Sequence, residues 1–157
     1  MKNLISFLAI VSFIFISACS QTGTDNAEKK TSAVSNMEEY FKTHDTAYVA
    51  EDAVFKNMTT GEETKGRKAI AEMLHYIYHV AFDAHADVTH TMVTEKNAVL
   101  EATFSGKHIG DFAGIPATGN EVNVPLCVTY DLNDAGLIKE ARIYMLTDVM
   151  MQQLKPH

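Results

Sequence analysis

The chain is poor in cysteine and in basic residues, and both shortages exclude classes of protein. Its 157 residues include only two cysteines, too few for a disulfide framework. Thirteen Lys and Arg stand against 20 Asp and Glu, which gives a net charge of −7. Because nucleic acid is bound through a basic stripe, we predict no nucleic-acid partner. The sequence also lacks tryptophan, internal repeats, a Gly-rich phosphate loop and a nucleophile elbow.

The N-terminal segment has the pattern of an export signal. Lys2 is followed by an apolar run over residues 4–16, which at ~1.5 Å per residue is too short to cross ~30 Å of hydrocarbon. With Ile16-Ser17-Ala18-Cys19 after it, the segment resembles the signal peptide of bacterial lipoproteins. The resemblance implies that residues 1–18 are removed, that Cys19 is lipidated, and that the exported protein is anchored to a membrane on its periplasmic or cell-surface side. The alternative is a plain signal peptide whose cysteine is incidental.

Behind this signal we predict a tether and one folded domain. Residues 19–35 have no aromatic and almost no branched apolar side chain, so we expect a flexible tether. Residues 36–157 form the predicted domain, with 46% hydrophobic and 21% charged residues in the whole chain, an ordinary globular balance. About 120 residues can bury a sufficient core without disulfides.

Within the domain, hydrophobic periodicity predicts helices first and strands afterwards. A period near 3.6 predicts helices over residues 36–50, where His44 shares the spacing of Tyr40 and Phe41, and over 67–81. A short strand is expected between them, over 52–58. Period-two alternation then predicts four long strands, which are followed by a short terminal helix: 82–94, 98–108, 121–131, 137–147 and 148–154.

This order predicts an α+β fold in which a curved antiparallel sheet has one apolar face covered by the N-terminal helices. Long strands twist and curl, so the covered sheet forms a cone with a pocket at its mouth. Concave pockets of this kind bind small molecules, and we expect a small-molecule ligand. A homodimer through the open sheet face is an alternative use of the same fold.

Several segments resemble the SnoaL-like polyketide cyclase (ester cyclase) family of the nuclear transport factor 2-like superfamily. The matching stretches lie at the second helix, around the 109–120 loop and in the last strand: residues 66–70, 104–112, 114–119, 134–138, 142–144 and 153–154. The resemblance implies a cone fold and ring closure by acid–base chemistry, with a carboxylate and a histidine and without metal or cofactor. It also implies that the family's histidine corresponds to His108.

The residues themselves support a similar assignment of a catalytic and a binding set. His108 and His90 have the parity of the apolar sheet face, and a histidine in a cleft can transfer protons near neutral pH. Glu140 shares parity with Arg142 and Tyr144, so it is the carboxylate expected to face inward, whereas Asp131 lies opposite Tyr130. We therefore predict His108 and Glu140 as catalytic, with a larger set that binds the ligand: His90, Tyr130, Arg142 and Tyr144.

Three observations keep other interpretations open. Leu146 occupies the position at which many relatives carry an aspartate, which favours a non-catalytic small-molecule-binding lipoprotein or a dimeric interaction module. His108 and His90 can also be core histidines with satisfied hydrogen bonds. His75 and His79 have the i, i+4 spacing of a helical zinc pair but are expected to face water, so we predict neither a metal nor a cofactor.

Overall fold

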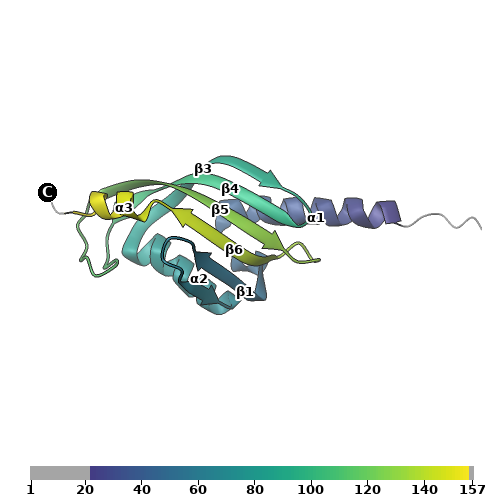
Figure 1. The fold of residues 1–157 in the computed structure, drawn as a ribbon, viewed down its shortest axis with the longest axis horizontal. Coiled ribbons are helices and arrows are strands. Elements are labelled where there is room, and N and C mark those ends of the chain that lie inside the picture. The colour runs from purple at the N-terminus through teal and green to yellow at the C-terminus, as the bar shows by residue number, and fades with distance from the viewer. Residues whose placement is uncertain (1–21, 156–157) are drawn as a thin grey trace, which may run out of the picture.

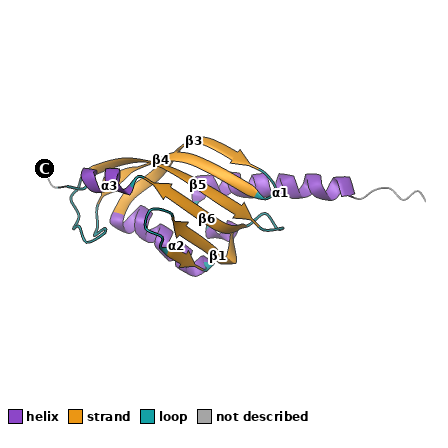
Figure 2. Ribbon diagram, in the orientation of Figure 1, coloured by secondary structure: helices purple, strands orange, loops and turns teal. Residues whose placement is uncertain are grey.

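The computed structural model describes residues 22–155 and confirms the predicted α+β architecture. The predicted signal peptide and Cys19 lie outside the described residues. Figures 1 and 2 show a curved sheet with α1 and α2 behind it. The elements, in chain order, are α1 (Thr22–Thr43), a 3-10 turn (Thr46–Tyr48), β1 (Val49–Asn57), β2 (Glu63–Lys65), α2 (Arg67–His75), a π-helical segment (Tyr76–Ala81), β3 (Phe82–Val93), β4 (Asn97–His108), β5 (Glu121–Leu132), β6 (Ile138–Met145) and α3 (Thr147–Gln153).

The six strands form one sheet in the order β2-β1-β6-β5-β4-β3. Neighbouring strands are antiparallel except β1 and β6, which pair in parallel and make the sheet mixed rather than purely antiparallel. The predicted alternation holds along β4 and β5, where every second residue from Ala98 to Phe104 and from Val122 to Leu132 is buried. These side chains pack with Met37, Tyr40 and Ile70 of the two helices into one core.

Helix α1 differs from the prediction at both ends. It begins at Thr22, so residues 22–35 are helical where a flexible tether was predicted. Ala33 is only 1% exposed, and its small side chain lets the helix approach Gly136, whose carbonyl accepts a hydrogen bond from Asn36 Nδ2 at 3.2 Å. The helix ends at Thr43 because His44 adopts a positive φ of 51° and Asp45 caps the following 3-10 turn.

Between residues 22 and 155, no helix combines the length and apolar character needed to cross a membrane.

Candidate functional site

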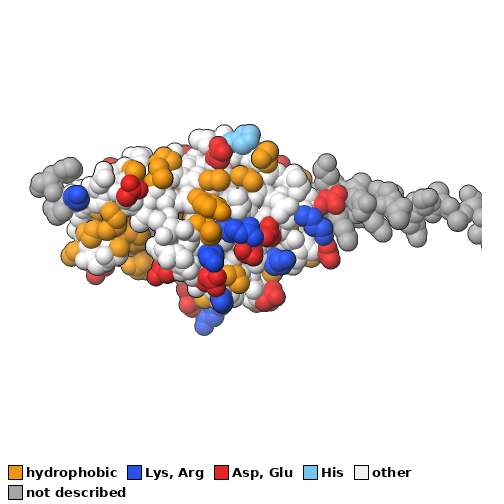
Figure 3. Space-filling model, in the orientation of Figure 1, with side chains coloured by type: hydrophobic (Ala, Val, Ile, Leu, Met, Phe, Trp, Pro, Cys, Tyr) orange, Lys and Arg blue, Asp and Glu red, His pale blue; other side chains and the backbone are white. Residues whose placement is uncertain are grey.

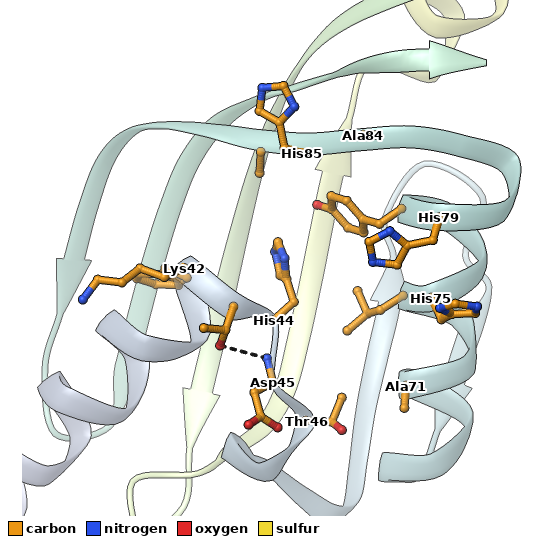
Figure 4. A pocket seen from close by; sticks show the side chains of 14 residues that line it. Lys42, His44, Asp45, Thr46, Ala71, His75, His79, Ala84 and His85 are labelled. Carbon is orange, nitrogen blue, oxygen red and sulfur yellow. Dashed lines mark hydrogen bonds between the residues drawn. The ribbon is translucent and has the colours of Figure 1, made fainter. Parts of the chain in front are cut away.

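Two adjoining cavities lie between the helices and the concave face of the sheet. The outer cavity, of about 480 Å³, opens to solvent between the end of α1, α2 and β3 (Figure 4). The inner chamber, of about 80 Å³, lies deeper, against β4, β5 and β6. Both are lined by the same four residues, so their walls are continuous: His44, Leu74, Tyr78 and Ala86.

The inner chamber is apolar and carries no ionised side chain. Its wall is made mainly of aliphatic and aromatic groups, with the three tyrosines Tyr40, Tyr78 and Tyr130 among them. Burial raises the pKa of Tyr78 to about 12, and it raises the pKa values of Tyr40 and Tyr130 as well. All three hydroxyls are therefore protonated at neutral pH. Tyr130 was predicted to bind the ligand and lines this chamber, but its role in binding stays a prediction.

His44 marks the boundary between the two cavities. Its ring lies 4.7 Å from that of Tyr78 and 5.6 Å from that of Tyr40, measured between centroids. Burial lowers the pKa of the His44 imidazole, and repulsion from His79 lowers it further. No residue between 22 and 155 forms a hydrogen bond or ion pair with the ring. A neutral imidazole with both nitrogens available thus faces the cavities.

Local backbone geometry holds these groups in place. The His44 backbone N–H donates to the Tyr40 carbonyl at 2.8 Å and closes α1, with φ in the left-handed region that few non-glycine residues adopt. Tyr78 lies in the π-helical segment, a rare conformation that is frequent at functional sites. That segment is joined to the 109–120 loop, because the backbone N–H groups of Ile109 and Gly110 donate to the Ala81 carbonyl.

The mouth of the outer cavity is polar and rich in histidine. His75, His79 and His85 line it together with Lys42 and Asp45. Figure 4 shows His44 and His79 turned toward one another across the opening, whereas His75 and the end of Lys42 point away. The rings of His75 and His79 are 5.4 Å apart. Over the described part of the chain, no group of three His, Cys, Asp or Glu side chains is arranged to hold a metal ion.

His108 points inward but does not line either cavity. It is fully buried, and its ring lies 5.1 Å from that of Phe82. The backbone N–H of Thr118 donates to His108 Nδ1 at 3.2 Å, and the Thr118 hydroxyl lies 3.0 Å from the same nitrogen. Because Nδ1 accepts, the proton lies on Nε2, which has no hydrogen-bond partner among residues 22–155. The structure therefore places His108 in the core, where it holds the 109–120 loop.

The prediction that His90 faces inward is wrong. Val88 pairs with Ala102, but His90 pairs with Glu101, so Thr89 is an extra residue in β3. Such a bulge shifts the alternation by one residue and turns the following side chains to the other face. His90 is consequently exposed on the outer face.

The prediction that Glu140 faces inward with Arg142 and Tyr144 is wrong for the same kind of reason. Asp131 pairs with Glu140 and Leu132 with Ile138, so Lys139 is an extra residue in β6. Ala141 and Ile143 turn to the core instead, and Glu140 lies on the outer face. There Arg142 contacts Asp131 at 2.6 Å and Glu140 at 3.0 Å, and it holds the pKa of Asp131 below its usual range. In the view of Figure 3, acidic and basic side chains lie close together over β5 and β6.

The structure thus separates the predicted catalytic pair, since His108 is in the core and Glu140 is on the outer face. It also identifies a residue that lines both cavities but was not predicted as a site residue, His44. The signal was present in the sequence, because His44 follows Tyr40 and Phe41 at helical spacing and so continues the inward stripe of α1.

Comparison with solved structures identifies the class of this fold. The chain is similar to a protein of Jannaschia sp. CCS1 named as a SnoaL-like polyketide cyclase, with 19% identity over 80% of this chain and 92% of that one and a TM-score of 0.70. A phenazine biosynthesis-related protein of Pseudomonas aeruginosa has 18% identity, 86% and 92% coverage and a TM-score of 0.70. IdmH of Streptomyces antibioticus, also named as a polyketide cyclase, has 21% identity, 79% and 96% coverage and a TM-score of 0.61. These similarities confirm the predicted fold of this chain, the nuclear transport factor 2-like cone.

The family follows from a second comparison. The family model described as SnoaL-like polyketide cyclase matches residues 32–154, which include the whole of the described domain core. This chain belongs to the SnoaL-like polyketide cyclase family. No curated protein matches it.

Proposed function

We propose that this protein binds a small, largely apolar molecule with one polar group, of the carbonyl-compound class, in the cavities described above. The observation that supports the proposal is that the two cavities share one continuous wall, which is apolar in the inner chamber and polar at its boundary with the outer cavity. The inner chamber is lined by aliphatic and aromatic side chains, and the boundary carries the imidazole of His44, which has no hydrogen-bond or ion-pair partner among residues 22–155. Ligand sites in proteins commonly combine an apolar wall with a few polar groups that orient the ligand.

Native purification followed by mass spectrometry of an organic extract tests this proposal. We expect the wild-type protein to retain one small molecule in stoichiometric amount. The matched variant Ala86→Leu places a larger side chain where both cavities meet, and we expect it to lose that molecule. Wild-type protein that carries no extractable ligand and binds none from an extract of the native cell would contradict the proposal.

Proton transfer without a cofactor is a second candidate function, favoured by the unpaired imidazole of His44 at the boundary of the cavities. A neutral imidazole can accept a proton from an acidic C–H group next to a ligand carbonyl. The test is exchange of that C–H hydrogen for deuterium in heavy water, with the extracted ligand as substrate. Exchange by the wild-type protein that is lost in His44→Asn supports catalysis, and a ligand returned without deuterium leaves binding as the function.

The proposal also places the domain at a membrane surface, through a lipid on Cys19. It is supported by the resemblance of residues 1–19 to a lipoprotein signal. We expect the full chain to incorporate labelled palmitate and to sediment with membranes, and Cys19→Ser to do neither. Palmitate incorporation that persists in Cys19→Ser would contradict the assignment of the lipid to this residue.

A further inference from the structure

The polar end of the ligand can be inferred from the groups at the cavity mouth. Of the four histidines that line the outer cavity, His85 is exposed and its Nε2 lies 3.2 Å from the Asp87 carboxylate. His75 points away from the opening, whereas His44 and His79 face one another (Figure 4). Neither His44 nor His79 has a hydrogen-bond or ion-pair partner over residues 22–155. Two imidazoles on different elements therefore present free nitrogens to the same space.

The charged side chains around this pair are already engaged elsewhere. The Lys42 ammonium lies 3.0 Å from the Glu39 carboxylate. The Asp45 carboxylate accepts the backbone N–H of Ala47 at 2.8 Å, where it caps the 3-10 turn. The other titratable groups packed against His44 are the hydroxyls of Tyr40 and Tyr78, which burial keeps protonated. No carboxylate of the described residues is thus positioned to neutralise a positive charge at His44 and His79.

We propose that the ligand carries a carboxylate, which lies between His44 and His79 while its apolar body fills the inner chamber. This inference rests on the proposed binding function and names the ligand class of that site. A carboxylate accepts hydrogen bonds from both rings, and charge-assisted hydrogen bonds are about twice as strong as neutral ones. A neutral carbonyl gains only the weaker bonds, and a cation is repelled once either ring is protonated.

Binding of such an anion is coupled to a proton. Burial and the neighbouring His79 lower the pKa of His44, so its ring is neutral at pH 7 in the empty cavity. A bound carboxylate favours the imidazolium form and raises that pKa, so the complex takes up a proton. Affinity for the acid consequently falls as pH rises above the lowered pKa of His44 in the empty cavity, whereas affinity for an uncharged analogue does not.

Calorimetric titration with phenylpropionate and phenylpropanol tests the inference, because the two probes differ only in the acidic group. We expect the full domain to bind the acid about tenfold more tightly than the alcohol at pH 6.5. We also expect the binding heat to depend on buffer ionisation in the sense of proton uptake, on the order of one proton per site. His44→Asn, which keeps a residue tolerant of positive φ, loses this preference and the proton uptake but still binds the alcohol.

Two further variants make the outcomes distinct. His79→Asn changes an exposed residue, so it is expected to fold normally and to weaken the acid selectively. His90→Asn is the matched control, because His90 is exposed on the outer face and lines neither cavity, and it is expected to bind both probes like the wild type. Equal binding of acid and alcohol, or acid binding without proton uptake, overturns the carboxylate inference and leaves the proposed binding function standing. Failure of both probes also overturns it, and the extraction experiment then decides the proposed function separately.

Discussion

The rings of His44 and Tyr78 contact one another at a tilt of 32°, with 4.7 Å between their centroids, at the place where the outer cavity meets the inner chamber. One ring comes from the left-handed residue that ends α1, and the other from the π-helical segment after α2. Both backbones are in sparsely populated conformations, which persist only where the surrounding structure maintains them. The boundary of the cavities is therefore formed by two irregular helix ends.

The pH dependence of stability should reveal the half-buried His44. Its pKa is lowered in the folded protein, so below about pH 6.5 the unfolded chain binds more protons than the folded one. The free energy of unfolding is expected to fall as pH decreases from 7 toward 5, and then to level off once pH passes below the folded-state pKa. Urea unfolding at several pH values measures this slope. His44→Asn is expected to flatten it, while His90→Asn, at an exposed histidine of the outer face, leaves it unchanged; the same slope in His44→Asn would refute the assignment.

Filling the boundary between the cavities should remove binding without unfolding the protein. Ala86→Leu adds volume at a wall shared by both cavities and is expected to cost about 1–3 kcal/mol of stability through overpacking. Ala71→Leu adds the same volume to the outer cavity alone. We expect equilibrium dialysis with the extracted ligand to show binding by Ala71→Leu and none by Ala86→Leu. Similar affinities for the two variants would show that the ligand does not enter the inner chamber.

Replacement of His108 should lower the stability of the folded protein and leave its ligand affinity nearly unchanged. The side chain is fully buried and its Nδ1 accepts from Thr118, so His108→Ala leaves a cavity and an unsatisfied backbone N–H. We expect the free energy of unfolding to fall by about 2–4 kcal/mol. Because His108 lines neither cavity, ligand affinity per folded molecule is expected to stay within about a factor of two of the wild type, which corresponds to about 0.5 kcal/mol. A variant that unfolds like the wild type but no longer binds would restore His108 to the site.

The variant Glu140→Gln should have nearly the same stability and ligand binding as the wild type. Glu140 lies on the outer face beside Arg142, at 3.0 Å and partly exposed, where an ion pair contributes less than about 1 kcal/mol. Arg142 keeps its 2.6 Å contact with Asp131 in this variant. We expect a change of at most about 0.5 kcal/mol in unfolding free energy and no change in ligand binding or deuterium exchange. Loss of exchange in Glu140→Gln would indicate that the outer face takes part in the chemistry.

The elements and the family could be predicted from the sequence because their signals are local. Period-two alternation from Ala98 to Phe104 and along 122–132 identifies strands that have one buried face, and the stripe from Ile70 to Ile77 identifies a helix that covers them. The start of α1 could not be predicted in this way. Residues 22–35 are weak in apolar side chains, and Ala33 becomes a core residue only because Gly136, far along the chain, leaves room for it.

The order of helices and strands, the buried alternation of β4 and β5 and the inward direction of His108 all follow from local sequence patterns. Which polar side chains share the cavity depends on how the strands pair and how the helices pack. An extra residue at Thr89 and another at Lys139 turned His90 and Glu140 outward, and such bulges arise from pairing with the neighbouring strand rather than from the strand's own pattern. His44, Tyr78 and His79 line the same cavity because the end of α1 and the π-helical segment pack against the same sheet. These two segments are distant in the sequence, so no local sequence pattern predicts that their side chains lie close together.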